Sequence, residues 1–338
     1  MSISIKNGRV HLDVTAAREL AAQVMRADGY AEREALIIAD HVLDAALCGY
    51  EYSGLPKLLD AVEHKRARLP RTPLRVLRES PVSTLFDAGN NIGMFAMRDA
   101  TQAAIDKAQA SGIVLVGVNN SWMSGRSAYY CEMIARAGLI GIITVGSAAQ
   151  VAPLGGATAV IGTNPIAFGL PGERHPFIFD MGTSAMMWTD LSLRERRGET
   201  IPPDMAIDAD GLPTQDPARA RKGALLPFGG YKGFGLALVM QALAITAGSG
   251  LTMDKNYGYL IIAFKPDLLV PLADFKRELE EMIRRVKNSP RQADVAEIRI
   301  PSERSFRERE RLLADGIEID ELIYDALNRH AAAGAQKS

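Results

Sequence analysis

The sequence predicts an α/β fold in which helices cover a mixed β-sheet. Two short runs, residues 113–118 and 139–145, are almost entirely apolar. Continuous apolar runs of this length are typical of strands that are buried on both faces. Residues 97–110 and 128–137, which precede these runs, carry apolar side chains at helical spacing. The alternation of helix and strand places a buried sheet at the centre of the chain.

Helices flank this central region at both ends of the chain. Residues 15–25 and 32–47 show helical spacing and end at Asp28-Gly29 and Gly49, since glycine is common just after a helix. Further helices are predicted over residues 236–247, 272–287, 307–314 and 321–333. Strands are predicted over residues 83–87, 260–264 and 297–300, the last two at sheet edges.

These elements divide the chain into two domains. We predict a helical domain for dimerisation and substrate binding that combines residues 1–75 with residues 275–338. Residues 76–274 form the cofactor-binding sheet domain, and residues 195–225, which are polar and rich in turn residues, form an irregular excursion from it.

Composition excludes several classes of function. The 338 residues carry a formal net charge of −1, and no basic stripe indicates a nucleic-acid partner. The chain has no apolar run of the roughly 20 residues that span a membrane and no signal-peptide core, so we expect a cytoplasmic protein. Cys48 and Cys131 are too few for a disulfide framework. The five histidines are scattered without ligand spacing, so no metal site is predicted.

Three segments with glycine or turn residues are the best candidates for a binding site: Gly162-Thr163-Asn164-Pro165, residues 177–184, and Gly229-Gly230-Tyr231-Lys232-Gly233-Phe234-Gly235. Glycines around Lys232 let the backbone approach a ligand, and the helix that follows directs free N–H groups to the same place. An anionic ligand would bind there. The same patterns also fit a solvated lysine loop, a strand-entry turn at Asn164, and a carboxylate at Asp180 that caps a helix beginning near Thr183.

Taken together, these segments resemble the malate/L-lactate dehydrogenase family, whose nicotinamide-binding fold is not the usual Rossmann fold. The resemblance runs from about residue 31 to about residue 320. It implies an oxidoreductase that uses NAD or NADP and forms a homodimer. It also implies cofactor contacts at Asn120, Ser147, Gly162, Thr163, Asn164, Pro165, Asp180, Met181, Gly182, Thr183, Lys232, Gly233 and Arg304. No Gly-x-Gly-x-x-Gly fingerprint is present, so the cofactor is implied by the resemblance alone.

The chain departs from the family pattern where the family places its acid–base histidine. Most members read Gly-His-Asp-Ser-His-Gly with an arginine after two further residues, whereas this chain reads Gly49-Tyr50-Glu51-Tyr52-Ser53-Gly54-Leu55-Pro56-Lys57. Ser53 therefore stands at the position of the catalytic histidine. Lys57 stands at the position of the arginine that clamps the substrate carboxylate, and it supplies a positive charge without a bidentate fork.

A second departure lies in Asn120-Ser121-Trp122-Met123-Ser124-Gly125, where Met123 replaces a histidine. Methionine cannot exchange a proton. The predicted catalytic residues are Tyr52, Ser53, Lys57 and Asp180. Lys57 is expected to hold the carboxylate, while Tyr52 or Ser53 donates any needed proton or positions water.

The missing histidines favour one reaction over another. An iminium is already protonated, so its reduction needs a hydride and little proton chemistry, whereas oxidation of a hydroxyl needs a base. We therefore expect NAD(P)H-dependent reduction of a small 2-oxo acid or ketimine carboxylate. Two alternatives are a 2-hydroxy-acid dehydrogenase of the malate/L-lactate type and a homologue that binds nucleotide without turnover.

Overall fold

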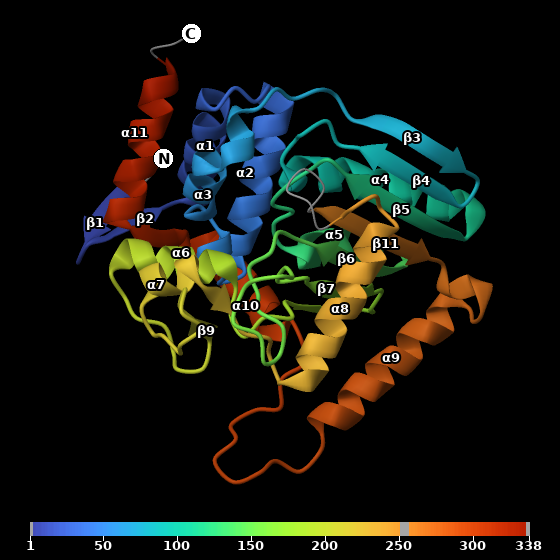
Figure 1. The fold of residues 1–338 in the computed structure, drawn as a ribbon. Coiled ribbons are helices and arrows are strands. Elements are labelled where there is room, and N and C mark those ends of the chain that lie inside the picture. The colour runs from blue at the N-terminus through green and yellow to red at the C-terminus, as the bar shows by residue number, and fades with distance from the viewer. Residues whose placement is uncertain (1–2, 251–256, 336–338) are drawn as a thin grey trace.

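A seven-stranded sheet lies at the centre of the computed structural model, which describes residues 3–250 and 257–335 (Figure 1). Strands β4 and β5 pair in parallel, and all other neighbours in the sheet are antiparallel. The α/β prediction with a mixed sheet is confirmed. In spatial order the strands are β3 (Arg75–Ser80), β4 (Ser83–Asp87), β5 (Ile113–Asn119), β11 (Gly258–Phe264), β6 (Ile140–Gly146), β7 (Ile166–Leu170) and β8 (Phe177–Met181).

Strand β11 corrects the sequence prediction of an edge strand over residues 260–264. It lies between β5 and β6 and pairs with both along its whole length. The reason is its composition, because an almost wholly apolar run suits a strand covered on both faces. Residues 297–300, also predicted as an edge strand, adopt no strand. Glu297 and Arg299 are exposed, and this segment belongs to none of the sheets formed by residues 3–250 and 257–335.

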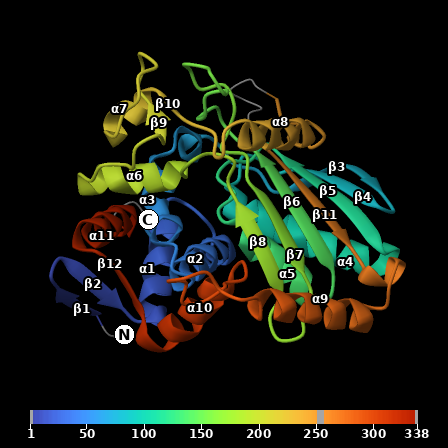
Figure 2. The ribbon, with the colours of Figure 1, turned by 90° about the horizontal axis from the view of Figure 1, so that it is seen from below.

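Helices cover both faces of the sheet (Figure 2). Helices α4 (Gly93–Ser111) and α5 (Ser127–Arg136) pack on one face, where Gly141 of β6 faces Ile134 of α5. Gly146 has the opposite parity in the same strand and faces Ala244 of α8 (Tyr231–Ile245) on the other face. A long helix, α9 (Leu272–Lys287), lies beside the sheet after the short helix η3 (Pro266–Leu268).

The two ends of the chain come together in a helical part. It contains β1 (Ile3–Lys6), β2 (Arg9–Leu12), α1 (Val14–Ala27), α2 (Glu32–Leu47), η1 (Glu51–Ser53), α3 (Lys57–Glu63), η2 (Lys65–Arg68), α10 (Glu303–Asp315), β12 (Ile317–Asp320) and α11 (Glu321–Ala335). Strands β1, β2 and β12 form a small sheet. The core of the helical part includes Ala17, Ile38, Leu58 and Leu327, all of them fully buried.

Residues 188–225 form a third, smaller part above the helices in Figure 2. It contains α6 (Trp188–Arg197), β9 (Ala206–Ile207), α7 (Pro217–Lys222) and β10 (Ala224–Leu225). The predicted irregular excursion therefore contains regular elements, and Asp216 starts α7 by accepting a hydrogen bond from the Ala218 N–H at 2.8 Å. None of the helices in the described residues is both long and apolar enough to cross a membrane.

Candidate active site

One cavity of about 280 Å³ brings together residues from the helical part and from the edge of the sheet. Of the predicted site residues, Tyr52, Ser53, Lys57, Pro165, Asp180, Met181 and Gly182 line it. They lie in η1, at the beginning of α3, directly before β7 and at the end of β8. The four predicted catalytic residues are therefore neighbours in space, although Asp180 is separated from the others by more than a hundred positions in the chain.

Local structure explains how Lys57 reaches the cavity. Helix α2 ends at Cys48, and Gly49 takes a positive φ of 77° that turns the chain. Gly54 then packs against α2, where an added Cβ would lie 2.9 Å from the Ala46 Cβ. The fully buried Leu55 and the N-cap residue Pro56 follow. Lys57 is consequently fixed as the first residue of α3, facing the cavity.

The Lys57 side chain is nearly buried, with 7 % of the residue exposed. Within the described part of the chain its ammonium makes no hydrogen bond or ion pair, although Asp60 is close enough to favour its charge. Burial lowers the pKa of Lys57 from 10.5 to about 8, and Asp60 offsets only part of this effect. An amine with this pKa exchanges a proton near neutral pH.

Tyr52 and Ser53 lie beside Lys57 in η1. The Tyr52 ring meets the Tyr50 ring edge-on at 6.2 Å. Burial, followed by the nearby Tyr50 and Asp190, raises the pKa of Tyr52 to about 12. Its phenol is therefore a weaker acid than free tyrosine. Ser53 is half-buried and lines the cavity at the position where most family members carry a histidine.

Arg126 is a site residue that the sequence analysis did not include. Its side chain is 10 % exposed, and its Nη2 donates to Asp44 Oδ2 at 2.6 Å. Its backbone N–H donates to His41 Nε2 at 2.9 Å, a close approach that requires glycine at position 125. The Arg126 Nε is buried without a partner among the described residues. The guanidinium thus lines the cavity with unused donor capacity, held in place by Asp44 of α2.

Asp180 orients the start of α5. Its Oδ2 accepts a hydrogen bond from the Ala128 N–H at 2.7 Å. Burial raises the pKa of Asp180 above its ordinary value, although the N–H groups of Ala128 and Ser127 and the charge of Arg126 oppose the rise. The alternative that Asp180 caps a helix beginning near Thr183 is wrong, because α6 begins at Trp188 and the carboxylate bonds to α5 instead.

The glycine-rich loop before α8 lies at the rim of the same cavity. The Phe228 N–H donates to the Thr183 carbonyl at 3.1 Å, and the Ala185 N–H donates to the Leu226 carbonyl at 2.7 Å. Gly229 and Gly230, which follow, have positive φ, and a Cβ on either would meet no atom within 4 Å. Lys232 is exposed in the first turn of α8. This open helix N-terminus suits a phosphate group.

The lining of the cavity combines apolar and polar groups that suit a nicotinamide ring. Four half-buried residues, Met181, Gly182, Met186 and Met187, give an apolar wall. Two polar atoms complement this wall: Arg126 Nε and Ser127 Oγ. Each is buried without a hydrogen-bond partner among the described residues. An apolar wall with a few unsatisfied polar groups is what a flat polar cofactor requires. In the described residues no group of three histidines, cysteines or carboxylates is arranged to hold a metal ion.

The other residues expected to contact the cofactor are not part of the cavity lining: Asn120, Ser147, Gly162, Thr163, Asn164, Thr183, Lys232, Gly233 and Arg304. Asn164 is fully buried and bonds to the Ser147 N–H, the Ala237 carbonyl and Gln241 Oε1. The Thr183 hydroxyl donates to the Thr163 carbonyl at 3.1 Å. These hydrogen bonds connect residues 163–164 to α8 and to Thr183, which follows β8.

Asn120 and Arg304 illustrate two other placements. Asn120 lies at the end of β5 and bridges Arg66 and Asp87 through its amide. The Arg304 guanidinium lies 5.0 Å from the centre of the Tyr50 ring, and Tyr50 lines the cavity. Met123, which replaces the second family histidine, packs against the core of the helical part and does not line the cavity.

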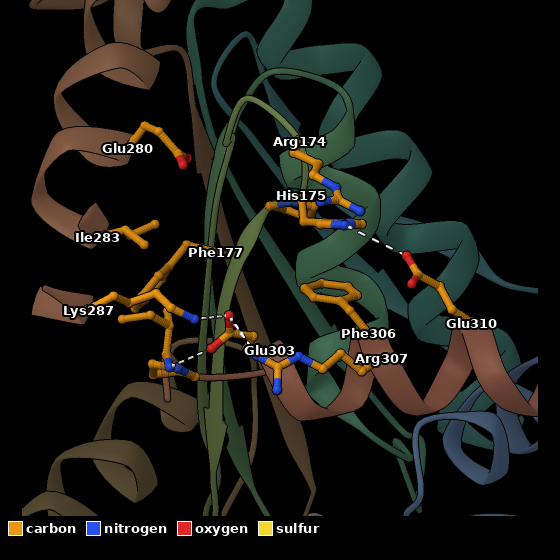
Figure 3. Close-up of a pocket in the computed structure, with 13 residues that line it drawn as sticks. Arg174, His175, Phe177, Glu280, Ile283, Lys287, Glu303, Phe306, Arg307 and Glu310 are labelled. Atoms are coloured by element: carbon orange, nitrogen blue, oxygen red, sulfur yellow. Dashed lines mark hydrogen bonds and ion pairs between the residues drawn. The ribbon is translucent and has the colours of Figure 1, made fainter. Parts of the chain in front are cut away.

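A second cavity lies between α9, the start of β8 and α10 (Figure 3). Lys287 bonds to Glu303, Arg307 lies 3.1 Å from Glu303, and His175 faces Glu310 at 3.9 Å. Most charged groups of this lining are therefore paired with one another. The unpaired lysine and the buried arginine that suit carboxylate chemistry are in the first cavity, which is therefore the candidate active site.

Together, these observations describe an α/β fold with one cavity that holds a nearly buried lysine and a nearly buried arginine. The family model for malate/L-lactate dehydrogenase matches residues 12–328. The chain belongs to this family, and it is an oxidoreductase, which implies a nicotinamide nucleotide as its redox partner. The sequence resemblance is thus confirmed.

Three relatives represent the family. L-sulfolactate dehydrogenase of Methanothermobacter thermautotrophicus is 32% identical over 91% of this chain and 93% of its own length. Delta(1)-pyrroline-2-carboxylate reductase 1 of Burkholderia ambifaria is 31% identical over 94% of this chain and 96% of its own length. The solved structure of malate dehydrogenase from Pyrococcus horikoshii OT3 superposes with a TM-score of 0.86 at 29% identity, covering 98% of this chain and 97% of that one.

Proposed function

We propose that this protein is an NAD(P)H-dependent oxidoreductase that transfers a hydride to a C=O or C=N carbon next to a carboxylate in a small acid. One observation supports this proposal most directly: Lys57 and Arg126, two nearly buried cations, line one cavity beside an apolar wall. A buried cation is costly unless an anion compensates it; Asp44 pairs with Arg126, whereas Lys57 has no ion pair within the described residues. The relatives named above include a sulfolactate dehydrogenase, a malate dehydrogenase and a pyrroline-2-carboxylate reductase, all of which act on small acids.

The protein's part in this reaction is binding and orientation. When bound, a reduced nicotinamide supplies the hydride. Arg126, fixed by Asp44, holds the substrate carboxylate through its unpaired Nε edge. Asp180 keeps the start of α5, and with it Arg126, in place. The methionines of the wall exclude water from the reacting carbon.

A panel of initial rates tests this function. NADH and NADPH are each combined with pyruvate, oxaloacetate, a 2,3-diketo acid, and the cyclic imines with a 2-carboxylate. We expect consumption of at least one reduced nucleotide with one of these acids, and the ratio of kcat/KM values decides between NAD and NADP. Nucleotide binding without turnover on any of them would favour the alternative of a non-catalytic homologue.

The same panel decides between the two enzyme alternatives. Loss of both family histidines favours reduction of a ketimine, and brisk oxidation of L-malate or L-lactate would favour a 2-hydroxy-acid dehydrogenase instead. Where both activities occur, the ratio of kcat/KM values identifies the preferred bond.

We further propose that the chain forms a homodimer. Helix α8 is apolar around its circumference, yet Leu238, Val239 and Ile245 are 45%, 52% and 60% exposed. Patches of this kind commonly mark an interface. Light scattering of the purified protein measures the mass in solution, and a monomer at micromolar concentration would rule this assembly out.

A further inference from the structure

We propose that Lys57 is the acid–base residue of this enzyme and takes over the task of the histidine that Ser53 replaces. The inference deepens the proposed function and rests on it. It also changes the role of Lys57 from a carboxylate clamp, as the family pattern implies, to a proton donor and acceptor. Arg126 is then the residue that holds the substrate carboxylate.

Position is the first argument. Ser53 and Lys57 line the same cavity and are joined by a turn that packs tightly against α2. Lys57 forms no ion pair within the described residues that would commit its protons elsewhere. A free amine in a cavity with an apolar wall is placed to meet the reacting atom of a substrate.

Elimination of the other candidates is the second argument. His41 is 1% exposed, does not line the cavity, and accepts a hydrogen bond from the Arg126 backbone at 2.9 Å through its Nε2. Asp180 uses its Oδ2 to hold α5. The Tyr52 phenol has a pKa of about 12, too high for a base near neutral pH. Met123 carries no exchangeable proton.

Burial lowers the pKa of Lys57, and the charge of Asp60 opposes this shift. Asp60, one turn along α3, favours its ammonium form, but Asp60 is itself engaged by Arg196 of α6 at 3.2 Å. Across the cavity lie Arg126, Asp180 and Tyr52, and His41 of α2 is near enough to sense the charge of Lys57. With a pKa of about 8, Lys57 is mostly protonated at neutral pH and still able to release its proton.

The proton and hydride transfers balance in reduction, and oxidation is the same sequence in reverse. In reduction of a 2-oxo acid, the carbonyl carbon accepts the hydride from the reduced nicotinamide nucleotide and the C=O π electrons move to oxygen. An N–H bond of the Lys57 ammonium breaks as its proton passes to that oxygen, leaving a hydroxy acid, the oxidised nucleotide and a neutral amine. Water then reprotonates the amine. For a ketimine, the same proton goes to the imine nitrogen before hydride transfer.

Lys57→Arg distinguishes an acid–base role of Lys57 from a role as carboxylate clamp, because most family members carry arginine as the clamp at this position. Arginine keeps the positive charge but does not lose its proton. An acid–base role predicts a kcat that is lower by about a hundredfold or more with little change in KM, since general acid–base catalysis contributes about 10²–10⁴-fold. A clamp role predicts unchanged or improved activity, and that result would overturn the proposal. Lys222→Arg, at an exposed lysine of α7, is the control.

The pH profile of the unmodified enzyme gives a second distinction. The proton donor is the ammonium, so reduction should slow as pH rises through about 8, whereas oxidation needs the neutral amine and should speed up over the same range. A clamp needs the charged form in both directions. Oxidation that slows with rising pH would therefore contradict the acid–base role.

Two further measurements do not depend on how well Lys57→Arg folds. Lys57→Cys treated with 2-bromoethylamine places a less basic amine at the same site, so partial recovery of kcat with both pH limbs moved to lower pH is expected. In protein labelled with ¹³C at lysine Cε, the signal absent from Lys57→Arg reports the Lys57 pKa directly. A value near 10.5 would overturn the proposal even in a protein that shows no turnover, whereas absent turnover with a value near 8 would count against the proposed function alone.

Discussion

Replacing Lys57 by methionine should stabilise the folded protein. The residue is only 7% exposed, and no ion pair within the described residues compensates its charge. Methionine has nearly the same length and buries no charge. Natural proteins often keep such costly groups where they are needed for activity, so removal of the group is expected to raise stability and lower turnover together.

The size of this effect follows from the change in pKa. A pKa lowered from 10.5 to about 8 corresponds to about 3 kcal/mol of free energy, at about 1.36 kcal/mol per pKa unit. This value is an upper limit, because Asp60 loses a favourable charge when Lys57 is removed. We therefore expect Lys57→Met to raise the free energy of unfolding by about 1–3 kcal/mol at pH 7.

The pH dependence has a definite sign. Between pH 8 and pH 10.5 the unfolded protein keeps the Lys57 proton and the folded protein has released it. The stability of the unmodified protein therefore rises with pH in this window. The advantage of Lys57→Met is complete below pH 8 and is lost as pH approaches 10.5.

Urea unfolding of both proteins at pH 7, 8, 9 and 10 measures this difference, with Lys222→Met as the exposed control. These pH values begin below the window between the two pKa values of Lys57 and rise through it in steps of about one unit. A variant that is less stable than the parent at pH 7, or an advantage that stays constant with pH, would refute the account of a buried, uncompensated lysine.

Two further predictions concern the cofactor side. A nicotinamide nucleotide at a hundredfold excess over its dissociation constant should stabilise the fold by about 2.7 kcal/mol; the absence of a thermal shift with both NADH and NADPH at saturating concentration would count against the proposed cofactor. Asn164→Ala should lower the free energy of unfolding by at least about 2 kcal/mol, because it leaves the Ser147 N–H and the Gln241 amide without their partner. Unchanged urea stability would place Asn164 at the cofactor rather than in the scaffold.

Local sequence signals predicted many elements closely. The helix expected over residues 32–47 matches α2, and the strand expected over residues 83–87 matches β4. Both are bounded by glycine or turn residues, whose backbone preferences act locally. The position of β11 in the middle of the sheet depends instead on pairing with β5 and β6, which are distant in the chain. Strand order of this kind cannot be obtained from periodicity.

In the candidate site, too, local motifs predicted some residues, while contacts between distant parts of the chain could not be predicted. Matching the family pattern identified Ser53, Lys57 and Asp180, and the structure brings them to one cavity. Arg126 was missed as a part of it because its role depends on Asp44, 82 positions earlier in the chain. Asn164 is expected to contact the cofactor, and this stays a prediction; its side-chain amide makes hydrogen bonds inside the protein. Motifs identify which residues are near a site, whereas their roles depend on partners from elsewhere in the chain.

Arg126 and Lys57 should therefore respond differently to substitution. Arg126→Lys keeps a charge but loses the forked donor, so a substrate carboxylate loses a charge-assisted hydrogen bond. We expect KM to rise about tenfold to a hundredfold, equivalent to about 1.5–3 kcal/mol, while kcat changes little. Lys57→Arg should produce the opposite pattern.

The control for Arg126→Lys is Arg309→Lys. Arg309 also contacts Asp44, at 2.9 Å, but does not line the cavity. A disturbance of the Asp44 network alone would raise KM in both variants, whereas loss of a direct contact raises it only in Arg126→Lys. The amide of the best 2-oxo acid sharpens the comparison, because it lacks the carboxylate and should be bound equally by parent and variant. A rise in KM of the same size for acid and amide would show that Arg126 supports the cavity without touching the carboxylate.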